Sequence, residues 1–402
     1  MKIAFAGRVS LDSLAEVGTW NRPLPEAKAG FPFGSELVRC LVARGHSVAV
    51  VTEHNVAKVE KYLCKTAVGA LEVWLVPRRS RSRWTLLTLF YKEMCGIRNA
   101  IREIGPDVVF AQWTYHNAYA GSTSGYPCLV VAHDSPWRVM WTMRTVVFLI
   151  KAMYSQFFVL PKIKNLSVVS PHIGNDFRKM GYRGHMSLIG NGYSSGTVSP
   201  SLKSDVAAKV VMVTQWGRLK NSKVMLKAWE ILHRRHENWK LVVCGDYMDE
   251  HGAEPWMRKA GLGDLIDGGA VELRGFVGQA KIRDELRTAD LFVSPSLEES
   301  FGMVFLEAMA QGVPCVGGEK SGAVPWVLGC EGVSDENSET RGGVVCDVTT
   351  PAELADCVEK VMVDAEFRRQ LSEGGRRRVR EVFDIKKVIG MYEKELARVA
   401  SL

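Results

Sequence analysis

The stretch Ser294–Val316, with the sequence SPSLEESFGMVFLEAMAQGVPCV, decides the fold of this chain. The apolar run over residues 291–295 predicts a strand, and the apolar spacing over 303–311 predicts a helix after a short loop. Gly312 followed by Pro314 is the order in which glycine and proline end helices. A strand, a loop and a helix in close succession form the unit from which parallel α/β sheets are built.

The same alternation continues along the rest of the chain. Further strands are predicted at residues 2–6, 47–52, 73–76, 108–111, 129–132, 166–170, 209–214, 240–244, 271–274, 314–317 and 343–346. Further helices are predicted at residues 35–44, 84–104, 173–180, 223–236, 281–288, 351–364 and 366–382. Strands that are apolar without alternation imply parallel sheets covered by helices on both faces. Two such successions predict an α/β protein with two doubly wound, Rossmann-like domains.

A polar stretch, YSSGTVSPSLKS at residues 193–204, separates the two successions. Serine, proline and glycine without periodicity are typical of a linker. We therefore expect an N-terminal domain over residues 1–195 and a C-terminal domain that begins near residue 205 and ends near residue 385.

Composition and charge exclude several classes of protein. The chain has 402 residues, 47% of them hydrophobic, which is ordinary for a globular protein and excludes a disordered or collagen-like chain. The formal net charge is +8, but residues 1–200 hold 24 basic and 12 acidic side chains, whereas residues 201–402 hold 28 and 32. The nine cysteines form no CxxC pair, so we expect neither a zinc ribbon nor a disulfide framework, but a reducing cytoplasm. The segment after Gly7 is too polar for a secretory signal, and Lys151 interrupts the most apolar run, 146–160, which is too short to span a bilayer.

The helix predicted at 303–311 offers an anion site at its beginning. The backbone N–H groups of Gly302, Met303 and Val304 have no partner inside the helix and are placed to bind a phosphate. Glu299 precedes this site and Glu307 lies on the helix, where carboxylates suit the hydroxyl groups of a diol. The alternative is that Glu299 caps the helix and that Glu307 is only solvated.

A second candidate follows the strand predicted at 209–214, in TQWGRLKNSKV at Thr214–Val224. Gly217 permits close approach of the backbone, and Arg218 and Lys223 supply two cations beyond the end of a strand. Together these cations would neutralise a departing diphosphate, so no metal is required, and the chain contains no Asp-x-Asp pair. The alternative is a basic surface loop.

Taken together, these motifs resemble those of one family. The run from Glu299 to Glu307, followed by AMAQGVP, resembles the Glu-x7-Glu signature of retaining nucleotide-sugar glycosyltransferases of the GT-B fold, in family 4, also called glycosyl transferases group 1. Gly217–Arg218 with Lys223 is similar to the Gly-Arg-x4-Lys phosphate motif of that family. The resemblance implies two domains that face each other across a cleft, with a nucleoside diphosphate sugar held by the C-terminal domain. It also implies that the last helix, here residues 386–402, crosses back to the N-terminal domain.

The resemblance assigns roles to the residues of the C-terminal half. Arg218, Lys223 and the helix beginning at Phe301–Val304 would stabilise the leaving diphosphate. Glu299 would hold hydroxyls of the sugar, and Glu307 those of the ribose. It implies no cofactor and no essential metal.

The N-terminal half resembles the family more loosely. GFPFGSE at residues 30–36 resembles its glycine loop, in which Gly34 would let the backbone approach the donor, and His133–Asp134 resembles its His-Asp pair. The resemblance implies that His133 contacts the donor sugar. Two departures, GNGYS at 190–194 and Trp326, leave the sugar and the acceptor unspecified.

The basic run RRSRSRW at Arg78–Trp84 lies in the half that would bind the acceptor. Cations beside Trp and Leu suit an anionic membrane surface or a phosphorylated lipid acceptor. No nucleic-acid motif accompanies the run, so we expect no nucleic acid as a partner. The alternative is a solvated basic loop.

We therefore expect a metal-independent retaining glycosyltransferase that moves a sugar from a nucleoside diphosphate sugar to an acceptor hydroxyl, in cell-envelope glycan, glycolipid or secondary-metabolite biosynthesis. We expect it in the cytoplasm, with contact to the cytosolic face of a membrane. Two alternatives stay open at this point, a sugar-nucleotide 2-epimerase of the GT-B fold and a non-catalytic protein that binds sugar nucleotides. The sequence leaves the sugar, base, acceptor and oligomeric state open.

Overall fold

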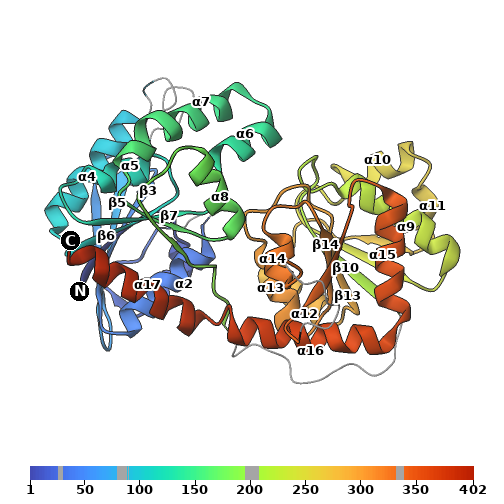
Figure 1. The fold of residues 1–402 in the computed structure, drawn as a ribbon. Helices are drawn as coiled ribbons and strands as arrows, with labels where there is room; N and C mark the ends of the chain where they lie inside the picture. The colour runs from blue at the N-terminus through green and yellow to red at the C-terminus, as the bar shows by residue number, and fades with distance from the viewer. Residues whose placement is uncertain (26–29, 79–87, 89, 195–207, 332–338) are drawn as a thin grey trace. The chain divides into compact units, whose positions relative to one another are not determined.

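The computed structural model describes residues 1–25, 30–78, 88, 90–194, 208–331 and 339–402. The chain divides into two compact units (Figure 1). Unit 1 consists of Met1–Gly192 with Lys386–Leu402, and unit 2 consists of Tyr193–Ile385. The boundary between Gly192 and Tyr193 falls at the start of the expected linker. Most of that linker, residues 195–204, lies outside the described residues. Each unit is described by itself.

Unit 1 contains a nine-stranded sheet in the order β2-β4-β5-β3-β1-β6-β7-β8-β9. All pairs are parallel except β2 with β4 and β4 with β5. The strands are β1 (Lys2–Ala6), β2 (Thr19–Trp20), β3 (Ser47–His54), β4 (Glu60–Lys65), β5 (Ala70–Pro77), β6 (Val108–Gln112), β7 (Cys128–Ala132), β8 (Asn165–Val168) and β9 (His185–Leu188). The central strands are buried along their length, as parallel strands covered on both faces must be.

The helices of unit 1 connect and cover these strands. They are α1 (Leu11–Ala15), α2 (Pro32–Ala43), α4 (Tyr91–Ile104), α5 (His116–Ser122), α6 (Pro136–Met143), α7 (Val146–Tyr154), α8 (Pro171–Lys179) and α17 (Ile385–Ala400), with a π-helical turn η1 (Ser155–Val159) and a 3-10 turn η2 (Leu160–Lys162). The sheet is thus doubly wound, and ligands of such sheets bind beyond the carboxyl ends of the strands.

Unit 2 contains a six-stranded sheet in the order β12-β11-β10-β13-β14-β15, and all its strands are parallel. The strands are β10 (Lys209–Val213), β11 (Lys240–Cys244), β12 (Val271–Leu273), β13 (Leu291–Ser294), β14 (Cys315–Gly318) and β15 (Gly343–Cys346). The helices are α9 (Ser222–Arg235), α10 (Ala253–Lys259), α11 (Gly263–Asp267), α12 (Gln279–Arg287), α13 (Met303–Ala310), α14 (Val324–Leu328), α15 (Pro351–Val363) and α16 (Ala365–Glu381). The prediction of two α/β domains with parallel sheets is confirmed.

The last helix, α17, belongs to unit 1 although unit 2 precedes it in the chain. The Tyr392 ring lies 5.1 Å from the Phe110 ring of β6, and Glu393 Oε1 lies 2.9 Å from His46 Nε2. His46 therefore holds a structural contact.

Several observed elements have other bounds than predicted, and some were not predicted at all. β2, β4 and β9 were not predicted, and α2 begins at Pro32 rather than at residue 35. The helix expected at 84–104 begins at Tyr91, directly after Phe90, whose φ of +59° is not helical. Of the basic run, only Arg78 lies within the described residues. Among the helices of the described part of the chain, none has the length and apolarity needed to cross a bilayer.

Candidate active site

Two loops of unit 2 carry the predicted donor residues. One follows β10 and the other follows β13, and these strands are neighbours in the sheet. The Leu297 N–H donates a hydrogen bond to the Leu219 carbonyl at 2.8 Å, which ties the loops together. The structure therefore brings Arg218 and Glu299 to the same edge of the sheet.

The two predicted cations of the first loop are exposed. Within the described residues, neither Arg218 nor Lys223 forms an ion pair with an acidic side chain. Lys223 Nζ lies 5.6 Å from the Trp216 ring and 5.3 Å from the Trp256 ring, at cation–π distance. In the described part of the chain, no atom lies within 4 Å of the point where a Cβ of Gly217 would be, so packing against these residues does not require glycine there. Both cations thus remain available to an anion.

A third cation, Lys220, was not predicted from the sequence. Its Nζ lies 2.5 Å from Glu299 Oε1. The loop after β10 therefore supplies the ion-pair partner of Glu299, which lies in the loop after β13. The Glu299 carbonyl accepts a hydrogen bond from the Ala323 N–H at 2.9 Å. Both the side chain and the backbone of Glu299 are therefore held.

The beginning of α13 is free of side-chain caps. Gly302 occupies the N-cap position with φ +88°, a left-handed conformation that favours glycine, and within the described residues no side-chain cap is formed at this end of the helix. Glu299 therefore does not cap the helix, and the first N–H groups at Met303 and Val304 have no partner within the helix. Phe301 is 3% exposed and its ring packs 5.5 Å from the Phe383 ring, so its side chain belongs to the apolar interior.

Glu307 lies in the second turn of α13. Burial raises the pKa of its carboxyl group to about 7, although the nearby Arg283 acts in the opposite direction. The side chain is half-buried, so Glu307 is not a fully solvated carboxylate. A carboxyl group half-ionised at neutral pH is a common feature of ligand sites.

In unit 1, His133 follows β7 and lies in an aromatic environment. Its ring is 5.0 Å from the Phe31 ring and 4.9 Å from the Trp113 ring. Burial lowers the pKa of His133 to about 3, so the ring is neutral at pH 7. His133 Nε2 lies 2.7 Å from Gln112 Oε1, which can only accept, so Nε2 carries the proton and Nδ1 is left as an acceptor.

Two neighbours of His133 show signs of a ligand site that the sequence did not reveal. Trp113 has φ +62°, a strained conformation for an aromatic residue, directly after β6. Gln112 is fully buried and its Nε2 has no hydrogen-bond partner in the described structure. Such strain and unsatisfied groups concentrate at binding sites.

The structure places Gly34 in the first turn of α2, where it is buried, and not in an open loop. A Cβ there would lie 2.8 Å from the Arg8 carbonyl and 2.7 Å from Phe31 Cδ1. Gly34 therefore lets α2 pack closely against the segment that follows β1 and seats Phe31 beside His133.

Cations and one acid gather at the same edge of unit 1. Arg8 follows β1, Arg78 follows β5 and Asp134 follows β7, while Lys151 comes from α7. Burial, together with Arg8 and Arg78, lowers the pKa of Lys151, and Asp134 acts in the opposite direction. Burial raises the pKa of Asp134 to about 6, against a hydrogen bond from the Tyr115 hydroxyl at 3.2 Å.

Another histidine of this half, His116, has a partner. Its Nε2 lies 3.1 Å from Glu53 Oε2, and its ring stacks 5.0 Å from the Phe90 ring.

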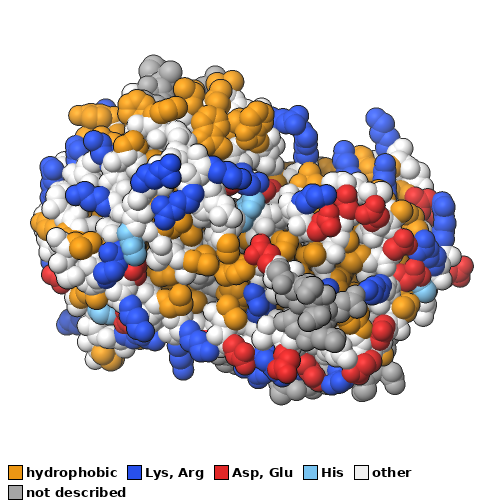
Figure 2. Space-filling view, in the orientation of Figure 1, with side chains coloured by type: hydrophobic (Ala, Val, Ile, Leu, Met, Phe, Trp, Pro, Cys, Tyr) orange, Lys and Arg blue, Asp and Glu red, His pale blue; other side chains and the backbone are white. Residues whose placement is uncertain are grey.

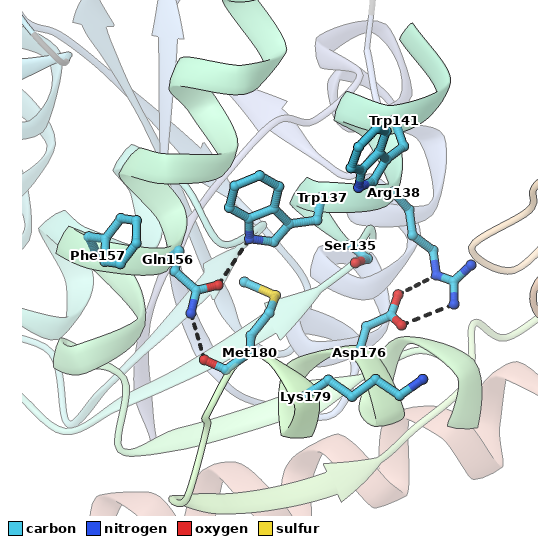
Figure 3. Close-up of a pocket in the computed structure, with 9 residues that line it drawn as sticks. All are labelled: Ser135, Trp137, Arg138, Trp141, Gln156, Phe157, Asp176, Lys179 and Met180. Atoms are coloured by element: carbon cyan, nitrogen blue, oxygen red, sulfur yellow. Dashed lines mark hydrogen bonds and ion pairs between the residues drawn. The ribbon is translucent and has the colours of Figure 1, made fainter. Parts of the chain in front are cut away.

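A cavity of about 520 Å³ lies in unit 1 among α6, η1 and α8 (Figure 3). None of the predicted site residues lines it. In the described part of the chain, no group of three or more His, Cys, Asp or Glu side chains is arranged to hold a metal ion.

Comparison with known proteins gives the family of the chain. The family model described as "Glycosyl transferases group 1" matches residues 199–378, and the model described as "Glycosyltransferase Family 4" matches residues 35–195. A similar curated relative is the N-acetyl-alpha-D-glucosaminyl L-malate synthase of Bacillus anthracis, which is 35% identical over 119 residues. That match covers 29% of this chain and only 29% of the relative's length.

Solved structures show the same fold over the whole chain. The sucrose-phosphate synthase of Thermosynechococcus elongatus has a TM-score of 0.75 at 17% identity and covers 100% of this chain and 99% of that one. Anabaena HepE, solved in complex with UDP and glucose, has a TM-score of 0.66 at 15% identity and covers 99% and 100%.

Proposed function

From the membership of the chain in glycosyltransferase family 4, the glycosyl transferases group 1 of GT-B fold, we propose its reaction. It transfers a sugar from a nucleoside diphosphate sugar to an acceptor hydroxyl, with retention of the anomeric configuration. The observation that supports the proposal is that Arg218 and Lys223 follow β10, that the uncapped beginning of α13 follows β13, and that these two strands are neighbours in unit 2. Two cations and the free N–H groups at the beginning of a helix are groups with which proteins bind phosphates.

The donor would bind to unit 2 through three kinds of contact. Arg218 and Lys223 hold the diphosphate, and the N–H groups at the start of α13 add the positive end of the helix dipole. Glu299, fixed by Lys220, accepts hydrogen bonds from hydroxyls of the sugar. Glu307 accepts hydrogen bonds from the ribose diol.

Transfer begins when the bond between the anomeric carbon and the diphosphate oxygen breaks. The electron pair leaves with the diphosphate, which the two cations and the helix stabilise, and an oxocarbenium-like centre remains. The acceptor oxygen attacks this carbon on the face that the diphosphate leaves, and its proton passes to the departing phosphate oxygen. The cations of the chain stabilise the leaving group, so we propose that no metal is required.

We assign the acceptor to unit 1. Nδ1 of the neutral His133 can accept a hydrogen bond from a hydroxyl group, because the Nε2–H group already donates to Gln112. Arg8, Arg78 and Lys151 make this edge basic, which favours an acidic acceptor. The Bacillus anthracis relative is named an N-acetyl-alpha-D-glucosaminyl L-malate synthase, and malate is an acid, in agreement with this chemistry.

We also propose that unit 1 touches an anionic membrane surface. We call the segment Trp141–Phe158 the α6–η1 face. Its exposed apolar side chains are Trp141, Met143, Val146, Val147, Leu149, Met153, Phe157 and Phe158, with exposed fractions of 38% to 71%. Figure 2 shows hydrophobic side chains gathered over α6 and α7 at the top of the view. The exposed Arg144, Lys162 and Lys164 on or beside this face complement anionic lipid, which is the signature of an interfacial surface.

The transfer proposal is tested in two stages. A thermal-shift screen of UDP-, GDP-, ADP- and dTDP-sugars identifies the donor, because a bound donor raises the melting temperature. Glu299→Ala and Lys223→Ala should then each lower transfer more than about 100-fold, the effect of losing a transition-state contact, without loss of folding. Lys227→Ala, an exposed position on α9, is the matched control.

The products decide the rest of the proposal. NMR of the new glycosidic bond should show the anomeric configuration of the donor, and turnover should persist in EDTA. Normal turnover by Glu299→Ala, an inverted product or dependence on a metal would each contradict the corresponding part.

A further inference from the structure

The cavity of unit 1 combines an apolar wall with polar groups. Trp137, Trp141, Phe157 and Met180 form the apolar part (Figure 3). Ser135 lies among them, between Trp137 and the pair formed by Arg138 and Asp176. The cavity adjoins the α6–η1 face, since Trp141 and Phe157 belong to both.

The Ser135 hydroxyl is an unsatisfied polar group at this cavity. Ser135 is 2% exposed, and its Oγ has no hydrogen-bond partner in the described structure. It occupies the N-cap position of α6, yet its side chain does not cap the helix. A buried hydroxyl without a partner costs free energy, so the position favours a ligand with a hydrogen-bonding oxygen.

The charges at the cavity favour an anion. Arg138 Nη2 donates to Asp176 Oδ1 at 3.0 Å, so these two charges offset each other. Lys179 is exposed and has no acidic partner within the described residues, which leaves the cavity with an excess positive charge. The first turn of α6 also lines the cavity, and the beginning of a helix carries partial positive charge.

We propose that this cavity binds the phosphate group of an anionic amphiphile, with Ser135 donating to a phosphate oxygen, Lys179 supplying the charge and the aromatic wall contacting the apolar part. The inference rests on the proposed membrane contact, in which the phosphate belongs to a lipid headgroup. A soluble phosphate ester offers the same chemistry. A neutral sugar would stack on the tryptophans but would provide no counter-charge for Lys179.

Vesicle binding by the full chain separates these sources. Binding to phosphatidylcholine vesicles with and without about a third of phosphatidylglycerol is measured by flotation, and binding of sn-glycerol 3-phosphate and maltose is measured by calorimetry. Ser135→Ala should weaken binding to the phosphatidylglycerol vesicles by about fivefold to tenfold, as expected for one hydrogen bond to a charged group. Lys179→Met should weaken it by at least as much.

The controls distinguish a built site from general attraction to an anionic surface. Lys162→Met removes one exposed charge from the neighbouring 3-10 turn η2, and its roughly fivefold loss measures the effect of a single surface cation, which the loss in Lys179→Met should exceed. Ser135→Ala changes no charge, so unchanged binding by this variant overturns the proposal. Its melting temperature without lipid should equal or exceed that of the natural chain, because the substitution removes an unsatisfied hydroxyl.

The remaining outcomes separate this inference from the proposed function. If vesicles do not bind but sn-glycerol 3-phosphate binds and depends on Ser135, the phosphate site stands and the membrane contact fails. If maltose binds in place of phosphate, the cavity is a glycan site and the proposal is overturned. Glycosyl transfer by Ser135→Ala to a soluble acceptor should match that of the natural chain. Failure of the proposed transfer reaction can therefore be told apart from failure of the phosphate site.

Discussion

Glu307 gives the sharpest prediction at the scale of a single residue. Burial raises the pKa of its carboxyl group to about 7, above the ordinary value of 4.5, so the folded chain binds a proton that the unfolded chain has already lost between these pH values. The free energy of unfolding therefore falls as the pH rises from 4.5 to 7, by at most about 3 kcal/mol. Glu307→Gln should match the natural chain at pH 4 and exceed its stability at pH 8, as measured by denaturant unfolding.

The same shift predicts how donor binding depends on pH. If the ionised carboxylate holds the ribose, only the ionised fraction of Glu307 binds well, about one tenth at pH 6. Affinity for the nucleoside diphosphate sugar, whose phosphates do not titrate in this range, should fall about tenfold from pH 8 to pH 6 in the natural chain and stay level in Glu307→Gln. A variant that keeps the full pH dependence would rule out this role.

Single residues also show what the sequence can and cannot reveal about the site. The spacing of Arg218, Lys223, Glu299 and Glu307 is readable along the chain, and the structure brings the loops that bear them to neighbouring strands. Lys220 is not readable in this way, because its pairing with Glu299 depends on the distance between two loops 79 positions apart in the chain. The burial that shifts the pKa of Glu307 is likewise set by packing and not by spacing.

At the scale of elements, the buried parallel strands were predicted best. β1 and β11 have the predicted bounds, because each is a short run of apolar residues that begins after a lysine and is buried along its length. β4 was missed because only two of its six side chains, Tyr62 and Cys64, are buried. β9 was missed because none of its side chains is fully buried. Strands at or near the edge of a sheet carry too little apolar signal to be recognised without their neighbours.

The α6–η1 face carries a prediction at the same scale. Val146 and Phe158 are 71% and 53% exposed and lie outside the cavity. Val146→Ser with Phe158→Ser removes apolar surface from the proposed contact and should lower binding to anionic vesicles about tenfold or more. Val68→Ser, at an equally exposed valine elsewhere on unit 1, is the control. Equal binding by the double variant and the control, measured by flotation, would exclude this face as the contact.

At the scale of the whole molecule, the path of the chain makes the two units unequal. Unit 2 is one continuous stretch, whereas unit 1 needs residues 386–402 to complete it. The part of α17 that follows residue 385 buries five apolar side chains almost fully: Val388, Ile389, Tyr392, Leu396 and Val399. Their burial is worth about 10 kcal/mol, which equals the whole free energy of unfolding of an ordinary domain.

A chain that ends at residue 385 should therefore lose the folded state of unit 1 and keep that of unit 2. Scanning calorimetry of this fragment should show one remaining transition, and the nucleoside diphosphate identified for the full chain should raise its temperature, because Arg218, Lys223 and α13 all lie in unit 2. Removal of only the exposed Ser401 and Leu402 is the control and should preserve both units. If unit 1 stays folded in the fragment, α17 is a dispensable addition to its sheet. If the remaining transition does not respond to nucleotide, donor binding needs groups from unit 1, and the assignment of the diphosphate site to unit 2 alone is wrong.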